Sequence, residues 1–170
     1  MKLCDLKTFC KFGLVLIGLN MSTYTQIIYQ IVFGSKDYSP FLSNENENML
    51  FAYIAGILKN KSCHPYIVGG VSNHIHIITH IHPAVALSLV VKDIKLASHK
   101  LILEKSGLFS NFTGWQTGYG AFTYNISSKV SLIKYVENQR EHHKGCSYKT
   151  ELTKLLSDHS VDFNEDFLLT

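Results

Sequence analysis

The sequence has few cysteines, few prolines and little net charge, and each shortage argues against a class of protein. Its 170 residues include four cysteines and three prolines, and the formal charge is +3. The cysteines form no Cys-x-x-Cys pair, which argues against a zinc ribbon or a disulfide framework and favours a reducing cytoplasm. So small a charge does not by itself require a nucleic-acid partner. What is present is a 46% share of hydrophobic residues, enough for one compact domain with a full core.

The two ends of the chain differ in composition from its middle. Residues 1–20 contain an apolar run, Phe12 to Leu19, but this run lacks a small-residue cleavage site and is too short to span a bilayer. We therefore interpret residues 1–20 as an N-terminal extension before a natural start at Met21, and we expect a cytoplasmic protein with no membrane contact. Residues 151–170 hold five acidic side chains against one lysine, which predicts an acidic C-terminal tail. One folded domain is expected over residues 21–150.

Hydrophobic periodicity predicts seven elements in the order β-α-β-β-α-β-α. Ser43 is the expected N-cap of the first helix, and Gly69 and Gly70 are expected to form the tight turn of a central hairpin. This order predicts an α+β fold of the ferredoxin-like (RRM-like) kind, an antiparallel sheet with helices on one face. The predicted strands are Tyr24–Phe33, Cys63–Val68, Val71–His80 and Ala121–Ile126; the predicted helices are Ser43–Asn60, Pro83 to about Gly107, and Ser127 or Ser128 to Gly145.

The predicted strand that ends at His80, with the two residues after it, carries four histidines at even-numbered positions. In an extended chain His74, His76, His80 and His82 fall on one side, and Ile75, Ile77 and Ile81 fall on the other. We expect the isoleucines to pack against helices and the histidines to face outward. Two imidazoles two residues apart are close enough to share a metal ion. In a chain with nine histidines, such a pair also arises without any function.

The last predicted helix carries a second candidate group. Tyr135 and Gln139 are four residues apart, so their side chains share one face, and His142 and His143 follow one turn later. A tyrosine on an amphipathic helix is more often a packing residue than a nucleophile. The polar Gln139 on the same face weakens that interpretation, and its amide oxygen is a suitable ligand for Mg²⁺ or Mn²⁺.

Together these segments resemble a known family. His74-Ile75-His76 resembles the His-hydrophobic-His motif of HUH endonucleases, and Tyr135-x-x-x-Gln139 resembles the nucleophile helix of the single-tyrosine transposases of the smallest bacterial insertion sequences. The stretch Gly114 to Phe122 (GWQTGYGAF) and the segment that begins at Met21 are similar to the same family. That family includes the repeated-palindrome-associated tyrosine transposases.

The resemblance implies roles for four residues. His74, His76 and Gln139 would bind Mg²⁺ or Mn²⁺, and Tyr135, on the last main helix, would be the nucleophile. Attack on single-stranded DNA would leave a 5′-phosphotyrosine and a free 3′-hydroxyl, which can be rejoined without ATP. The resemblance also implies a homodimer, with the tyrosine helix possible in trans, and recognition of hairpins at the element ends. Residues 21–150 would then be the HUH transposase catalytic domain.

Several alternatives stay open beside this resemblance. They are a relaxase-like or replication-initiator nickase, a domesticated transposase, a non-catalytic DNA- or RNA-binding protein with the same fold, and a metal-dependent hydrolase. No carboxylate is spaced to act as the base of such a hydrolase. Basic and aromatic side chains near the motifs are candidate DNA contacts, although a solvated helix face or core packing is an equally ordinary role for each: Lys92, Lys95, Lys100, Trp115, Lys134 and Arg140.

Overall fold

The computed structural model of the chain describes residues 24–164 and 168. The predicted extension over residues 1–20 and the start at Met21 lie outside these residues. The described strands form one antiparallel sheet in the order β2-β3-β1-β4, which confirms the predicted ferredoxin-like plan. The strands are β1 (Ile28–Gly34), β2 (His64–Val71), β3 (His74–His80) and β4 (Gly120–Tyr124).

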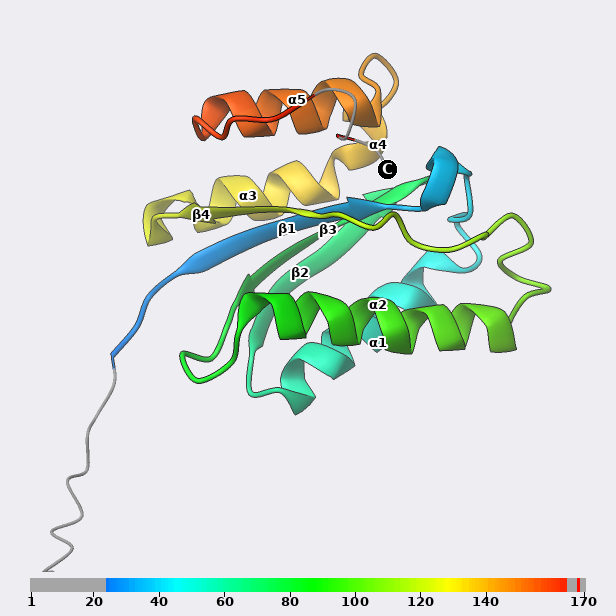
Figure 1. Cartoon of the computed structure of the whole chain (residues 1–170), viewed down its shortest axis with the longest axis horizontal. Helices are drawn as coiled ribbons and strands as arrows, with labels where there is room; N and C mark the ends of the chain where they lie inside the picture. Colours follow the sequence, from blue (N-terminus) through cyan, green and yellow to red (C-terminus); the bar gives the residue numbers. More distant parts are fainter. Residues whose placement is uncertain (1–23, 165–167, 169–170) are drawn as a thin grey trace, which may run out of the picture.

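Helices cover both faces of this sheet, with α1 and α2 on one face and α3, α4 and α5 on the other (Figure 1). The prediction of helices on one face holds for α1 and α2 and is wrong for the C-terminal third of the chain. Among the described residues, no helix is long and apolar enough to cross a membrane. The helices are α1 (Glu47–Asn60), α2 (Leu87–Glu104), α3 (Lys129–Glu137), α4 (Gln139–His142) and α5 (Tyr148–Asp158), with short 3-10 turns η1 (Lys36–Tyr38) and η2 (Ile126–Ser128).

The main apolar core lies between the sheet and the helices α1 and α2. Because strand side chains alternate between faces, Ile75 and Ile77 of β3 point into this core and are fully buried. The helices meet them with residues spaced three or four apart, the period of one helix face. These residues are Leu50, Ile54 and Leu58 of α1 and Val90, Ile94, Ser98 and Ile102 of α2.

The hairpin turn lies at Ser72 and Asn73, because the two glycines expected to form it belong to β2. A Cβ atom at Gly69 would lie 2.6 Å from Cγ1 of Val136 on α3. Any side chain at Gly69 would therefore push α3 away from the sheet. The glycine serves close packing of α3 on β2, and this packing places Tyr135.

The first helix begins at Glu47, later than predicted, and its N-cap is Asn46 instead of Ser43. The Asn46 side chain accepts a hydrogen bond from the Ser43 amide at 2.9 Å and donates to the carbonyl of Phe41 at 2.9 Å. Ser43 thus begins the turn that precedes the helix.

The predicted helix from Ser127 or Ser128 to Gly145 is broken in two at Asn138, whose φ/ψ of −92°/11° leaves the helical region. After the break the chain turns and forms α5, which was not predicted because residues 151–170 were set apart by their acidic charge. The side chain of Ser147 caps α5 by accepting from the amide of Thr150 at 3.1 Å. The tyrosine helix is therefore not the last main helix of the chain.

Candidate functional site

The histidines of β3 lie beneath α3, α4 and α5. His74 and His76 point to the face opposite Ile75 and Ile77, as the alternation predicts, and both are fully buried. The expectation that they face outward is wrong, because α5 was not foreseen and covers this part of the sheet. Tyr148, the first residue of α5, stacks on His74 with ring centroids 4.3 Å apart and planes 14° apart.

The carboxylate of Glu151, also on α5, lies at the centre of the site. Its Oε2 is 3.0 Å from Nε2 of His74, and its Oε1 is 3.3 Å from Nε2 of His76. Oε1 also accepts hydrogen bonds from the hydroxyl of Tyr135 and from Nε2 of Gln139, the latter at 2.9 Å. The histidines, the glutamine and the tyrosine implied by the resemblance therefore meet at the carboxylate of Glu151, which is 3% exposed.

Neighbouring polar groups fix the two histidine rings. Oδ1 of Asn73 lies 2.8 Å from Nδ1 of His74 and suits a proton on that nitrogen, so the His74 tautomer leaves Nε2 with a free lone pair. The amide of Gln30 contacts Nδ1 of His76 at 3.3 Å, and the hydroxyl of Tyr124 donates to Gln30 at 2.7 Å. In this arrangement the Gln30 amide donates to Nδ1 of His76. The opposite amide orientation, with the Tyr124 hydroxyl accepting instead of donating, would place the proton on Nδ1 and free Nε2 of His76 for a metal.

Burial and the central carboxylate shift the ionisation of the site. Burial lowers the pKa of His74 to about 4, against the opposing effect of Glu151. Burial alone would raise the pKa of Glu151, but the surrounding histidines, His143 first, lower it far below its usual range. Burial and the hydrogen bond to Glu151 raise the pKa of Tyr135. The site therefore holds a neutral imidazole, a carboxylate anion and a protonated phenol near neutral pH.

Three buried atoms of the site make no hydrogen bond with any residue that the structure describes: Nε2 of His74, Nε2 of His76 and Oε1 of Gln139. Buried polar atoms are nearly always paired, so three unpaired atoms in one place require an explanation. They are the ligand atoms implied by the resemblance, and nitrogen and amide oxygen donors suit a divalent cation. His74, His76 and Glu151 also offer ligand atoms that all lie within 4.8 Å of one another. The residues present therefore fit a divalent metal.

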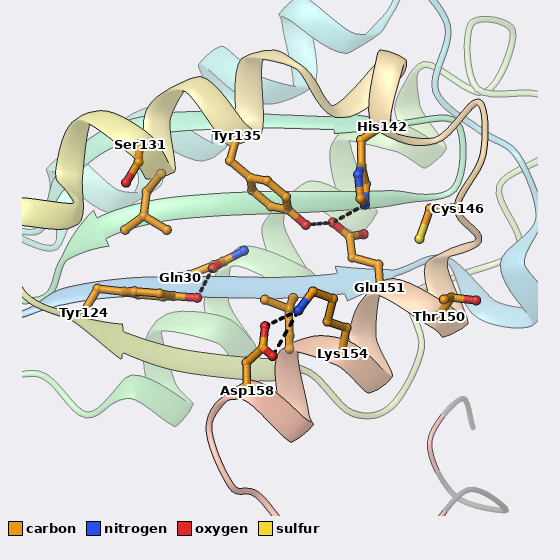
Figure 2. Close-up of a pocket in the computed structure, with 12 residues that line it drawn as sticks. Gln30, Tyr124, Ser131, Tyr135, His142, Cys146, Thr150, Glu151, Lys154 and Asp158 are labelled. Carbon is orange, nitrogen blue, oxygen red and sulfur yellow. Dashed lines mark hydrogen bonds and ion pairs between the residues drawn. The ribbon is translucent and has the colours of Figure 1, made fainter.

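A cavity of about 370 Å³ opens beside this group, between α3 and α5 (Figure 2). Tyr135 and His142 line one side, Glu151 and Lys154 line the other, and Tyr124 lies on the sheet below. The phenol hydroxyl thus lies between a largely apolar hollow and the carboxylate. A ligand that enters this cavity would contact the hydroxyl directly.

The sequence analysis missed Glu151 and underestimated His143. Nε2 of His143 lies 3.0 Å from Oε2 of Glu151 in hydrogen-bonding geometry. The statement that no carboxylate is suitably spaced is wrong, because folding brings α5 onto the histidines. A signal was present: Tyr148, Leu152 and Leu155 form the buried stripe of an amphipathic helix, and Glu151 lies on that stripe. An acidic residue on an apolar face indicates a buried charge with partners.

The six candidate DNA contacts separate into two groups. Lys95 donates to the carbonyls of Gln116 and Gly118 at 2.8 and 2.6 Å, and Trp115 donates to Ser98 at 3.1 Å within an aromatic cluster. These contacts hold the side chains of Lys95 and Trp115 within the protein. The other four candidates are exposed: Lys92 and Lys100 on α2, Lys134 on α3, and Arg140 on α4. Arg140 also forms an ion pair with Glu47. All six stay predictions as DNA contacts.

Residues 23–139 match the family described as IS200-like transposase. The fold is similar to that of a Deinococcus radiodurans R1 protein assigned as a transposase, with 18% identity, a TM-score of 0.54, and 69% of this chain and 95% of that chain covered. It is also similar to a REP-associated tyrosine transposase bound to a REP hairpin, with 17% identity, a TM-score of 0.50, and 72% and 74% of the two chains covered. No curated protein matches the sequence. Because the family match spans most of the chain, and the fold agrees with it, this protein belongs to the IS200-like transposase family.

Proposed function

We propose that the chain cleaves and rejoins single-stranded DNA, with Tyr135 as the nucleophile. One observation carries this proposal: the Tyr135 hydroxyl and the unpaired nitrogens of His74 and His76 meet around a single buried carboxylate. A tyrosine that only packed against the core would have no need of this polar group. The arrangement supplies a nucleophile and a cation site side by side, as metal-assisted phosphoryl transfer requires.

His74, His76 and Gln139 would hold Mg²⁺ or Mn²⁺. When bound, such an ion draws charge from a phosphate oxygen and makes the phosphorus more electrophilic. The protein holds the ligand atoms ready, because Asn73 fixes the ring of His74 and Gln30 contacts the ring of His76. Pre-ordered ligands reduce the reorganisation that binding and reaction would otherwise need.

In the proposed reaction, the phenol oxygen of Tyr135 forms a bond to phosphorus as the bond from phosphorus to the 3′-oxygen breaks. The products are a 5′-phosphotyrosine and a free 3′-hydroxyl, so the phenol loses one proton and the leaving oxygen gains one. The raised pKa of Tyr135 makes loss of this proton the difficult part of the step. Oε1 of Glu151 accepts the hydroxyl hydrogen bond and so orients the phenol oxygen. Because the pKa of Glu151 is lowered, the carboxylate is a weak base, and the released proton would pass to solvent in the cavity that Tyr135 lines.

The reverse reaction joins a different 3′-hydroxyl to the same phosphotyrosine. The covalent link keeps the energy of the broken phosphodiester, so joining needs no ATP. Water must stay away from the link, because hydrolysis would release the DNA end without joining it. The break at Asn138 separates α3 from α4, which would let the tyrosine helix move with its DNA end.

The proposed partner is a single-stranded DNA hairpin at the ends of an element. The REP-associated transposase of similar fold was solved bound to a REP hairpin, which supports this class of partner. Lys134 and Arg140 flank the site and are exposed, so they are the nearest candidates for phosphate contacts. The chain brings its own Tyr135 to its own histidines, and a homodimer with the helix exchanged stays a prediction.

The proposal is tested by incubating the protein with Mg²⁺ and labelled single-stranded DNA that carries the end of its own element. We expect a denaturation-resistant adduct and a released strand with a 3′-hydroxyl, and we expect Tyr135→Phe to give neither. Tyr53→Phe is the matched control, since Tyr53 lies on α1 at the opposite face of the sheet. Absence of any adduct from the wild-type protein would favour a non-catalytic DNA-binding protein, and cleavage without joining would favour a nickase.

A further inference from the structure

We infer that Glu151 is a fourth protein ligand of the metal, supplied by α5 through Oε2; this inference rests on the proposed function. Glu151 lies beyond the residues that match the family, 23–139. The transposase resemblance implied two histidines and a glutamine as the ligands. The inference makes α5 part of the catalytic centre and gives the site one anionic ligand.

The spacing of the ligand atoms supports coordination. An ion held at about 2.1 Å from two ligands at right angles separates those ligands by about 3 Å. Nε2 of His74 lies 3.0 Å from Oε2 of Glu151, and Nε2 of His76 lies 3.3 Å from Oε1. The carboxylate therefore lies beside the position of an ion that the histidines would share.

The directions of the ring nitrogens distinguish coordination from hydrogen bonding. His143 has its Nε2 aligned with Oε2 as a hydrogen bond requires, at 3.0 Å. Nε2 of His74 lies at the same distance from the same oxygen and makes no hydrogen bond, and neither does Nε2 of His76. A ring nitrogen that lies this close to a carboxylate oxygen without hydrogen-bonding geometry fits a ring and a carboxylate that face a common ion.

The two oxygens of Glu151 are used unequally. Oε1 accepts from Tyr135 and Gln139 and has no lone pair left over. Oε2 accepts from His143, which leaves one lone pair for a cation. A single carboxylate can therefore bind the metal through Oε2 and orient the nucleophile through Oε1.

Charge also favours this assignment. Glu151 is 3% exposed, and its hydrogen-bond partners are Tyr135, Gln139 and His143. A buried carboxylate is costly without a compensating positive charge. A divalent cation between Glu151 and the two histidines would supply that charge, and the anionic ligand would in turn strengthen binding of a hard ion.

The first test measures Mn²⁺ affinity of the full chain by calorimetry. We expect Glu151→Gln to weaken binding by about tenfold or more, and Glu137→Gln, an exposed glutamate of α3, to leave binding unchanged. Wild-type affinity in Glu151→Gln would overturn the inference. Circular dichroism of the same samples shows whether the variant is folded.

The second test distinguishes a ligand from a residue that acts through hydrogen bonds. Glu151→Cys, made in a Cys146→Ser background, should give a thiolate-to-Co²⁺ charge-transfer absorption that the background variant alone lacks. This band requires a metal–sulfur bond, so its presence decides the matter even if Glu151→Gln fails to fold. Because cysteine is shorter than glutamate, absence of the band overturns the inference when Glu151→Gln also keeps wild-type Mn²⁺ affinity.

The inference and the proposed function can fail separately. Wild-type adduct formation combined with wild-type Mn²⁺ affinity in Glu151→Gln would remove Glu151 from the metal and leave Tyr135 as the nucleophile. Mn²⁺ binding that depends on Glu151, combined with no adduct from the wild-type protein, would keep the metal site and contradict the DNA-cleaving function.

Discussion

The two faces of the sheet are built from alternate residues of the same strands and have different contents. The face under α1 and α2 is one continuous apolar cluster that includes Ile75 and Ile77. The face under α3, α4 and α5 has two smaller apolar clusters, and the buried group of His74, His76 and Glu151 lies with them. One strand, β3, thus contributes to the apolar core on one face and to the candidate site on the other.

This difference explains how a small domain can hold a costly polar site. Burying charged and unpaired groups destabilises a fold, and the site contains an anionic Glu151 and unpaired atoms of three residues. The apolar face has no such cost and stabilises the strands that carry the histidines. Four changes would break or sharpen this division of roles.

The largest expected effect comes from removing a ligand on the site face. His76→Ala should reduce Mg²⁺-dependent cleavage about 1,000-fold, since loss of metal assistance removes on the order of 4 kcal/mol of transition-state stabilisation. The free energy of unfolding of the metal-free protein should change much less than for a core deletion. Single-turnover cleavage and urea denaturation measure the two quantities. A cleavage rate within tenfold of wild type would contradict the role of His76.

Replacing Ile77, the residue after His76, should change stability and leave metal binding intact. Ile77→Ala removes a fully buried side chain from the apolar face and should lower the free energy of unfolding by about 2–5 kcal/mol. The folded fraction should keep its Mn²⁺ affinity, because Ile77 points away from the metal ligands. Urea denaturation with calorimetry checks both expectations, and a Mn²⁺ affinity that falls with stability would show that the two faces are not separable.

Acidification should destabilise the protein through the site face. His74 has a pKa of about 4 in the fold, because burial disfavours its charged form, against an ordinary value of 6.5. Between these values the unfolded chain binds more protons, so the free energy of unfolding falls as pH falls through this window, by at most about 3 kcal/mol. The depressed pKa of Glu151 acts in the same direction below its ordinary value.

His143 changes the free energy of unfolding with pH in the opposite direction. The hydrogen bond to Glu151 raises the pKa of His143 despite burial, so its contribution is present below pH 6.5 and is lost as pH rises through the folded value. The comparison of wild type with His74→Gln in metal-free buffer between pH 4 and 6.5 isolates His74. An equal slope in both proteins would contradict the assignment of this pH dependence to His74.

The smallest expected effect comes from the residues that hold the ring of His76 in place. Gln30→Leu removes the amide that contacts Nδ1 of His76 and should weaken Mn²⁺ binding by about tenfold. Tyr124→Phe, which removes only the donor to Gln30, should have a smaller effect in the same calorimetric titration. A larger loss in Tyr124→Phe than in Gln30→Leu would contradict the proposed order of support.

The sequence alone predicted the order of strands and helices along the chain as far as the tyrosine helix, and the alternation of β3, because both follow from hydrophobic periods of two and 3.6 residues. The hairpin turn was placed wrongly at Gly69 and Gly70, since a glycine that allows a turn looks the same as a glycine that allows a helix to approach. The break at Asn138 was not foreseen, because Asn is compatible with both a helix and a helix end.

For the site, local spacing was sufficient for His74 with His76 and for Tyr135 with Gln139. Glu151 was missed because nothing in its sequence neighbourhood relates it to β3; only the packing of α5 on the sheet brings them together. Its place on the apolar stripe of Tyr148 and Leu152 was the available signal. Burial of the histidines was missed for the same reason, since α5 is the element that covers them.

The central claim is that the site face performs phosphoryl transfer through Tyr135. The most direct measurement is peptide mapping by mass spectrometry of the protein after reaction with single-stranded DNA from its element end and nuclease digestion. The account predicts a nucleotide attached through its 5′-phosphate to Tyr135 in the peptide that contains α3, and no such mass when Mg²⁺ is removed. A nucleotide attached to any other residue, or an adduct that forms equally well without a divalent metal, would contradict it.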